Sequence, residues 1–184
     1  LKIIKDNISI EEKYILSKLN SAIRKATKLF DDYKLNETPS IVEDLFLKLS
    51  RTYIQLTREK STSDDKKVVL YTVYNVFMEA LKMFAPIAPF ITEKIYQNLK
   101  KEFSLEEESI HHFEWPKYDE NLINKELENE MDDMGDILQT IFSLREKIQL
   151  GVRWPLQEAI IVTKDDKTVK AVEKLKRIIK RGFN

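Results

Sequence analysis

The sequence predicts a mainly α-helical protein, an antiparallel bundle of four to five helices with a long last helix, followed by a truncated βα unit. Two observations predict this fold class. Apolar side chains recur every three or four residues through most of the chain, which is the spacing of one helix face. The 184 residues include only three glycines and five prolines, too few for the many turns of a β-sandwich or barrel.

The first two helices have clear start signals. Ser9 and Glu12 form a capping box at the start of the first helix. Thr38 and Pro39 are a favourable N-cap and first-turn pair for the second. Short connections favour antiparallel packing of such helices. Their apolar stripes contain Ile15, Leu19, Ile23, Ala26 and Phe30 in the first helix, and Val42, Leu45, Leu49, Tyr53 and Leu56 in the second.

Prolines separate the next two helices. The apolar spacing predicts a third helix over residues 66–84, and Pro86 and Pro89 interrupt the pattern after it. A fourth helix follows these prolines, and its apolar stripe contains Ile91, Ile95 and Leu99.

The segment after the fourth helix lacks the helical spacing of apolar side chains. Residues 109–116 are expected to be extended, because Trp115 precedes a proline. A long helix is then predicted over residues 119–150, which at ~1.5 Å per residue would measure about 48 Å. Gly151 is expected to end it. Arg145 falls on its apolar stripe, where we expect it to snorkel or to pair with a carboxylate.

The pattern changes again near the end of the chain. Residues 159–162 are a short β-like run, and residues 168–181 have the spacing of an amphipathic helix. A lone strand has no partner to pair with. We therefore expect a helical domain over residues 1–151 and the start of a truncated α+β domain over residues 152–184.

Charge is balanced overall but uneven along the chain. The 31 basic and 31 acidic side chains give a formal net charge of zero. Residues 102–135 carry 2 basic and 12 acidic side chains, whereas residues 136–184 carry 11 and 6. The basic ends could attract a polyanion that the acidic middle repels. The alternative is that these charges only keep the helices solvated.

Several classes of function lack a signal. The chain has no cysteine, and no apolar run reaches the ~20 residues that span a bilayer. Its only histidines, His111 and His112, are neighbours that would point to opposite faces of an extended segment. No glycine-rich phosphate loop is present. We therefore expect a cytoplasmic protein with no catalytic and no metal-binding residues in this chain.

A basic stripe on the second helix is the strongest candidate site. Lys48, Arg51, Gln55 and Arg58 follow one another at helical spacing. Arg51 and Arg58 have no carboxylate three or four residues away, whereas Lys48 follows Asp44 by one turn. Exposed arginines suit phosphate contact. A second stripe on the last predicted helix contains Lys167, Lys170, Lys174, Arg177 and Arg181.

Arg153 and Trp154 lie between the long helix and the β-like run. A planar cation beside a large aromatic ring could stack on an unpaired base. The alternative is that Trp154 is buried and fixes the angle between two domains.

Six short motifs are spread over nearly the whole chain. They are residues 14–20, 43–45, 50–54, 84–93 (which contain Ala-Pro-Ile-Ala-Pro-Phe), 109–116 (which end in Trp-Pro) and 152–156 (which contain Arg-Trp-Pro-Leu). Together they resemble the anticodon-binding region of class I aminoacyl-tRNA synthetases, most closely that of isoleucyl-tRNA synthetases. Two positions depart from the family pattern, which usually has Trp in place of Tyr14 and Thr52. The second departure removes an aromatic ring from the basic stripe.

The resemblance implies a function. The intact parent would be an isoleucine–tRNA ligase that uses ATP and Mg²⁺, but the family's ATP-site motifs and editing domain are absent here. This part alone should therefore be inactive and need no cofactor. Its partners would be an isoleucine-specific tRNA and the catalytic domain of the same chain, with no membrane contact, in a monomer. The tRNA-binding residues would be Lys48, Arg51, Gln55, Arg58, Arg153 and Trp154.

Three alternatives stay open. Valyl- and leucyl-tRNA synthetases share this helical region, so the same segment of either is the first. A helical protein-interaction scaffold without RNA binding is the second. A free-standing hydrolase is the third, although no pattern in the sequence indicates a pocket for one.

Overall fold

The computed structural model describes residues 8–58, 60, 62–151, 154, 158, 160–164, 168–169, 172–173 and 176. This part of the chain contains helices and no strand, which confirms the mainly α-helical class. The α-helices are α2 (Ile10–Asp31), α3 (Thr38–Leu47), α4 (Ile54–Leu56), α5 (Ser63–Phe84), α6 (Pro89–Phe103) and α7 (Lys125–Lys147). Three 3₁₀ helices, η1 (Leu35–Glu37), η3 (Ile110–His112) and η4 (Glu120–Leu122), and one π-helix, η2 (Lys48–Tyr53), complete the described elements.

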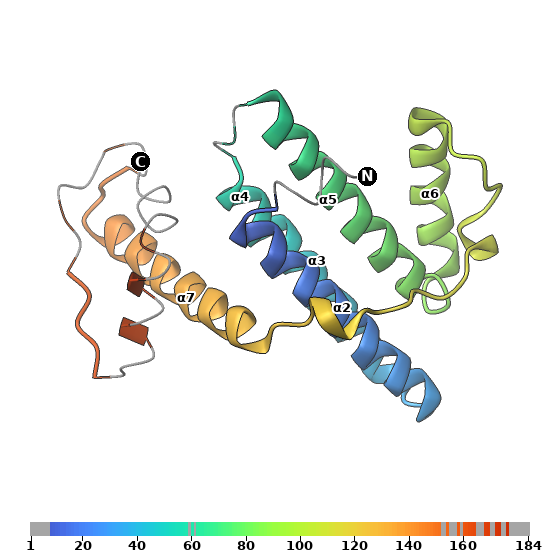
Figure 1. Cartoon of the computed structure of the whole chain (residues 1–184), viewed down its shortest axis with the longest axis horizontal. Coiled ribbons are helices and arrows are strands. Elements are labelled where there is room, and N and C mark those ends of the chain that lie inside the picture. The colour runs from blue at the N-terminus through green and yellow to red at the C-terminus, as the bar shows by residue number, and fades with distance from the viewer. Residues whose placement is uncertain are drawn as a thin grey trace.

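The helices form a bundle around α2. Helices α3, α5 and α7 each contact α2, and α6 packs on α5 at the opposite end of the molecule from α7 (Figure 1). Two hydrophobic cores result. The larger lies among α2, α3, η2, α5 and α7, and the smaller lies among α5, α6 and η3. Helix α5 belongs to both, so it joins the two parts of the fold.

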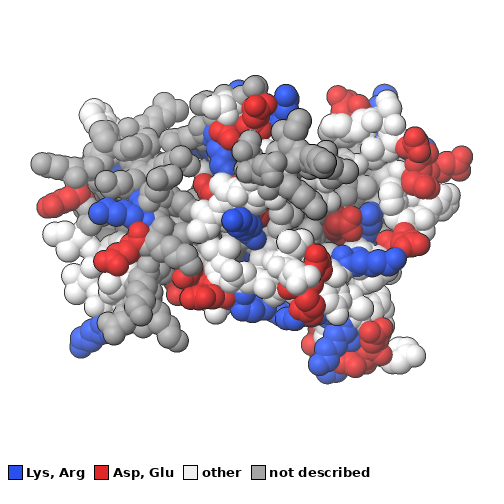
Figure 2. Space-filling view, viewed as in Figure 1, with Lys and Arg blue, Asp and Glu red and all other residues white. Residues whose placement is uncertain are grey.

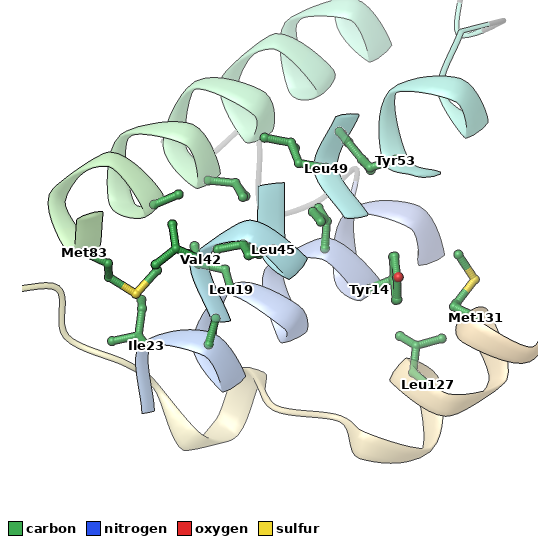
Figure 3. Close-up of a cluster of buried hydrophobic side chains, with 14 of the residues drawn as sticks. Tyr14, Leu19, Ile23, Val42, Leu45, Leu49, Tyr53, Met83, Leu127 and Met131 are labelled. Atoms are coloured by element: carbon green, nitrogen blue, oxygen red, sulfur yellow. The ribbon is translucent and has the colours of Figure 1, made fainter. Parts of the chain in front are cut away.

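The larger core is built from the apolar faces of these helices, among them Ile23, Leu45 and Tyr53 of the predicted stripes. Tyr14 and Ile23 of α2, Leu45 of α3, Tyr53 of η2 and Met131 of α7 are all buried in it. Figure 3 shows these stripes meeting, with Tyr14 facing Leu127 and Met131. Burying such side chains stabilises a domain by roughly 1.5–3 kcal/mol each. This core therefore fixes α3 and η2 against α2.

The smaller core centres on Tyr96 of α6. Its ring is fully buried, packs edge-on against Phe113 at 5.5 Å between centroids, and its hydroxyl donates to the carbonyl of Glu107 at 2.8 Å. Thr92 is buried one turn before it, whereas Ile91 of the predicted apolar stripe is 54% exposed. The other two residues of that stripe pack against this core, so the buried face of α6 is the predicted one extended by Thr92 and Tyr96.

The predicted helix starts are nearly correct. The capping box of α2 is present, with the backbone N–H of Ser9 donating to Glu12 at 3.1 Å. Helix α3 has Pro39 in its first turn, but its N-cap residue is Glu37, and Thr38 already lies inside the helix.

The long last helix is shorter than predicted. Helix α7 begins at Lys125 rather than at residue 119, because η4 forms first and Asn124 caps α7 by accepting from the N–H of Leu127 at 3.0 Å. Its 23 residues span about 35 Å. The helix packs against α2.

Helix α7 ends before Gly151. The N–H of Leu150 donates to the carbonyl of Arg145 at 2.9 Å, and the N–H of Gln149 donates to that of Glu146 at 2.9 Å. This pair of bonds is a Schellman motif, with Gln149 in the left-handed conformation at φ 55° where glycine is usual. Gly151 therefore follows the helix end and does not form it.

The predicted βα unit falls largely outside the described residues. Residues 160–163 form no strand, and residues 168, 169, 172, 173 and 176 are helical. The division into domains at residue 151 stays a prediction. The lysine- and arginine-rich stripe of residues 167–181 also lies outside the described residues.

Candidate nucleic-acid interface

A π-helix interrupts the second predicted helix at the candidate site. Buried Leu45, Leu49 and Tyr53 are spaced four apart, and in an α-helix each such step drifts about 40° around the axis. The wider turn of η2 removes this drift and keeps all three side chains against the core. Such π-helices are rare and occur often at functional sites. The second predicted helix is thus distorted where its basic residues lie.

Three members of the predicted stripe face solvent. Arg51 lies within η2, Gln55 lies in α4, and Arg58 lies in the turn that follows. All three are exposed. Across the described part of the chain, neither guanidinium group forms an ion pair, as the sequence predicts for these two residues. Their hydrogen-bond donors are therefore accessible to an external anion.

Lys48, the fourth member, is bound within the protein. Its ammonium group lies 2.9 Å from Oδ1 of Asp132 in α7, and its side chain is 29% exposed. The sequence suggests Asp44 as its partner, but the structure pairs it with a carboxylate of another helix. Lys48 thus points toward α7. A direct role for Lys48 in binding would require it to leave Asp132.

Asp132 links three elements. It accepts a hydrogen bond from Lys18 at 2.7 Å and one from the Tyr14 hydroxyl at 3.1 Å, besides its ion pair with Lys48. Burial alone would raise the pKa of Asp132, but the hydrogen bonds from Lys18 and Lys48 lower it below its ordinary value. Burial and the nearby carboxylate raise the pKa of Tyr14. Asp132 is therefore a charged hydrogen-bond acceptor shared by α2, η2 and α7.

Glu12 holds the other end of the basic segment, which comprises residues 48–58. It accepts hydrogen bonds from the Tyr53 hydroxyl at 3.0 Å and from Lys60 at 2.5 Å, and Ser9 donates to it as well. Burial would raise the pKa of Glu12, but the hydrogen bonds from Lys60 and Ser9 lower it. Tyr53 and Lys60 flank the segment that contains Arg58. Both ends of this segment are thus fixed to α2.

A third buried carboxylate joins α7 to α2. Glu128 accepts hydrogen bonds of 2.6 Å from both Ser17 and Ser21, and Lys125 donates to it at 2.8 Å. Burial would raise the pKa of Glu128, but these hydrogen bonds, led by that from Lys125, lower it. The capping box predicts the contact of Glu12 with Ser9, and Lys125 lies only three residues before Glu128. The other contacts of these three carboxylates join residues far apart in the chain, so sequence patterns do not predict them.

The acidic residues in the range 102–135 are partly neutralised by basic side chains of α2 and η2. Besides Glu128 and Asp132, Glu120 pairs with Arg24 at 3.0 Å. Figure 2 shows basic and acidic side chains interspersed on one face, with acidic ones gathered at the edge beside α6. The uneven charge along the sequence is therefore evened out in space where α7 packs on α2.

Trp154 is an exposed aromatic residue near the end of α7. Its side chain is 68% exposed. The buried guanidinium of Arg145 donates to the carbonyl of Gly151 at 2.9 Å and to the carbonyl of Trp154. Arg145 thus binds the turn after its own helix. Arg153 lies outside the described residues.

The described residues contain no group of three side chains suited to a metal ion. His111 and His112 lie in η3, not in an extended segment, and both are exposed. Among the described helices, none is long and apolar enough to cross a membrane.

An open groove of about 560 Å³ runs between α2, α5 and residues 113–122. Its charged side chains already have partners, since Lys82 pairs with Glu79 at 2.7 Å and lies over the Phe113 ring at 4.8 Å.

Comparison with known proteins agrees with this arrangement. Residues 12–161 match the family described as the anticodon-binding domain of tRNA ligase. The chain belongs to this family.

Its curated relatives include isoleucine–tRNA ligases. That of Thermococcus kodakarensis is 37% identical over 179 residues, which cover 95% of this chain and 17% of the relative. That of Pyrococcus horikoshii is 36% identical over 183 residues, with the same coverage. That of Clostridium tetani is 38% identical over 167 residues, which cover 87% of this chain and 16% of the relative. The chain thus spans about a sixth of the length of these relatives, and the resemblance to isoleucyl-tRNA synthetases is confirmed.

Proposed function

We propose that the chain binds the anticodon stem-loop of a tRNA through Arg51, Gln55 and Arg58. The observation that carries this proposal is the pair of exposed arginines, which have no ion-pair partner in the described structure. Guanidinium groups match the geometry of phosphate oxygens and also stack on bases. An exposed amide such as that of Gln55 can hydrogen-bond to the edge of a splayed base. Membership of the anticodon-binding family supports this assignment.

Trp154 and Arg153 form the second part of the proposed interface. An exposed indole offers a flat surface on which an unpaired base can stack. Arg153 adds a cation beside it in the sequence. Lys48 is proposed to support the interface from within, because its ammonium group is engaged by Asp132.

The parent protein is proposed to be an isoleucine–tRNA ligase. Its relatives carry that name and match most of this chain. Such a ligase would join isoleucine to its tRNA with ATP and Mg²⁺ in the cytoplasm, as a monomer. The catalytic domain of the same protein would perform this chemistry, since the chain lacks the ATP-site motifs. The anticodon-binding domain described above would hold the tRNA in register for that reaction.

A fluorescence-anisotropy titration tests the proposal. The 184-residue chain is titrated with an isoleucine tRNA, with a variant of that tRNA carrying a swapped anticodon, and with a valine tRNA. Each titration is run at two salt concentrations. We expect the affinity to fall when the anticodon is swapped.

The other outcomes reject all or part of the proposal, and they can be told apart. Equal and strongly salt-dependent binding of all three RNAs would mean that only phosphates are contacted and that no anticodon base is read. Absence of binding at low salt would favour the protein-interaction scaffold. Tighter binding of valine tRNA would keep the anticodon-binding function but reject the assignment to isoleucine.

A further inference from the structure

We propose that Asp132 is a positioning residue for RNA contact: it holds the π-helix η2 so that Arg51 faces the RNA. This inference rests on the proposed function. Asp132 lies on α7, and it acts through Lys48, its ion-pair partner at 2.9 Å at the first position of η2.

The π-helix needs support from outside itself. Its wide turn is rare in proteins and occurs mostly as a single turn inside an α-helix. Two contacts supply this support on either side of Arg51. Lys48 at one end binds Asp132, and Tyr53 at the other end donates to Glu12 at 3.0 Å. The backbone that carries Arg51 is therefore fixed at both ends.

The two anchors differ in what they join. Tyr53 and Glu12 belong to the hydrophobic core and the start of α2, so losing that contact would disturb the whole fold. Asp132 is only half-buried, and its side chain is 32% exposed. Its remaining partners, Lys18 and Tyr14, hold it in place without η2. Asp132 is therefore the anchor whose removal most selectively releases η2.

The sign of the charge change separates positioning from simple electrostatics. Asp132→Asn removes a negative charge, and by charge alone this would strengthen the attraction of a polyanion. The change also frees Lys48, which would strengthen binding further if Lys48 contacted phosphate directly. Positioning predicts the opposite result, because an unanchored η2 holds Arg51 less firmly. We expect Asp132→Asn to weaken binding of isoleucine tRNA about fivefold.

A matched control is the neighbouring residue. Asp133 is exposed and forms no ion pair among the described residues. Asp133→Asn makes the same charge change, so its affinity should stay equal or rise slightly. Asp132→Glu keeps the charge and should restore most of the lost affinity. Thermal unfolding of each variant shows that it is folded at the assay temperature.

A double-mutant cycle with Arg51→Ala completes the test, measured as tRNA affinity. Positioning predicts that Asp132→Asn causes no further loss of affinity once Arg51 is removed. Equal losses of tRNA affinity with and without Arg51 would overturn the inference. Stronger binding by Asp132→Asn with Arg51 in place would overturn it as well. If Asp132→Asn does not fold, Lys48→Gln replaces it in the same cycle. An unchanged affinity in Arg51→Ala alone would overturn the proposed RNA face as well as this inference.

Discussion

The hydroxyl of Tyr53 donates a hydrogen bond of 3.0 Å to Oε1 of Glu12, and both side chains are fully buried. This contact joins the end of the π-helix to the capping box of α2. The same carboxylate accepts from Lys60, beyond the basic segment. One buried charge thus fixes both the start of a core helix and the end of the candidate interface.

Replacing Tyr53 with phenylalanine should destabilise the fold. Tyr53→Phe removes a hydrogen bond to a buried carboxylate, and such bonds contribute about 1.5–3 kcal/mol. We expect the free energy of unfolding, measured with urea, to fall by about 2 kcal/mol. Tyr33→Phe is the control, since Tyr33 is 88% exposed and should be neutral. Equal stability of the two variants would contradict the role of this contact.

The carboxylates of Glu12, Glu128 and Asp132 should make stability depend on pH. Their pKa values are lowered in the folded chain from ordinary values of 4.5 for Glu12 and Glu128 and 3.8 for Asp132. The unfolded chain therefore binds protons first as the pH falls. The stabilisation is complete above about pH 5.5 and is lost as the pH falls through the folded pKa values.

Glu128→Gln tests this dependence. The variant should lose about 2 kcal/mol of unfolding free energy at pH 7, and this difference should shrink toward pH 3. Glu126→Gln, at an exposed position of the same helix, should leave the pH profile unchanged. A constant difference between Glu128→Gln and the parent across pH would show that the carboxylate's charge does not contribute.

A glycine at the end of α6 should stabilise the chain. Ser104 caps this helix at φ 51°, in the left-handed region that favours glycine. The N–H of Leu105 already closes the helix end by donating to Lys100 at 3.2 Å. Ser104→Gly should raise the unfolding free energy by about 0.5–1 kcal/mol, because it removes steric strain at this position. Ser104→Ala keeps the strain and should give no gain.

The two tryptophans should behave differently. Trp115 packs edge-on against Phe30 at 4.8 Å and donates to Thr27 at 2.9 Å, so Trp115→Ala should cost at least ~2 kcal/mol of stability. Trp154→Ala should leave stability within about 0.5 kcal/mol and weaken tRNA binding by about 1 kcal/mol or more. Unfolding curves and tRNA titrations measure both effects. Unchanged tRNA affinity in Trp154→Ala would exclude it from the interface.

The helices are readable from the sequence because their signals are local. Ser9 and Glu12 mark the start of α2, and the spacing of the apolar side chains marks its buried face. The sequence predicts too early a start for α7 because the residues of η4 also fit a helical pattern. Tertiary contacts decide such boundaries.

The candidate site can be predicted from the sequence only in part. Exposed Arg51 and Arg58 follow from the absence of nearby carboxylates in the sequence. The π-helix does not follow, since its extra residue per turn is selected by packing of Tyr53 against α2. The ion pair of Lys48 with Asp132 joins distant segments, so no spacing rule predicts it.

Charge reversal at Arg51 tests the central claim most directly. Arg51→Glu and Lys101→Glu make the same charge change at exposed positions of η2 and α6. With isoleucine tRNA at moderate salt, we predict that Arg51→Glu weakens binding at least about tenfold and Lys101→Glu weakens it no more than about twofold. Equal effects of the two variants, or no effect of Arg51→Glu, would contradict the assignment of this face to the anticodon stem-loop.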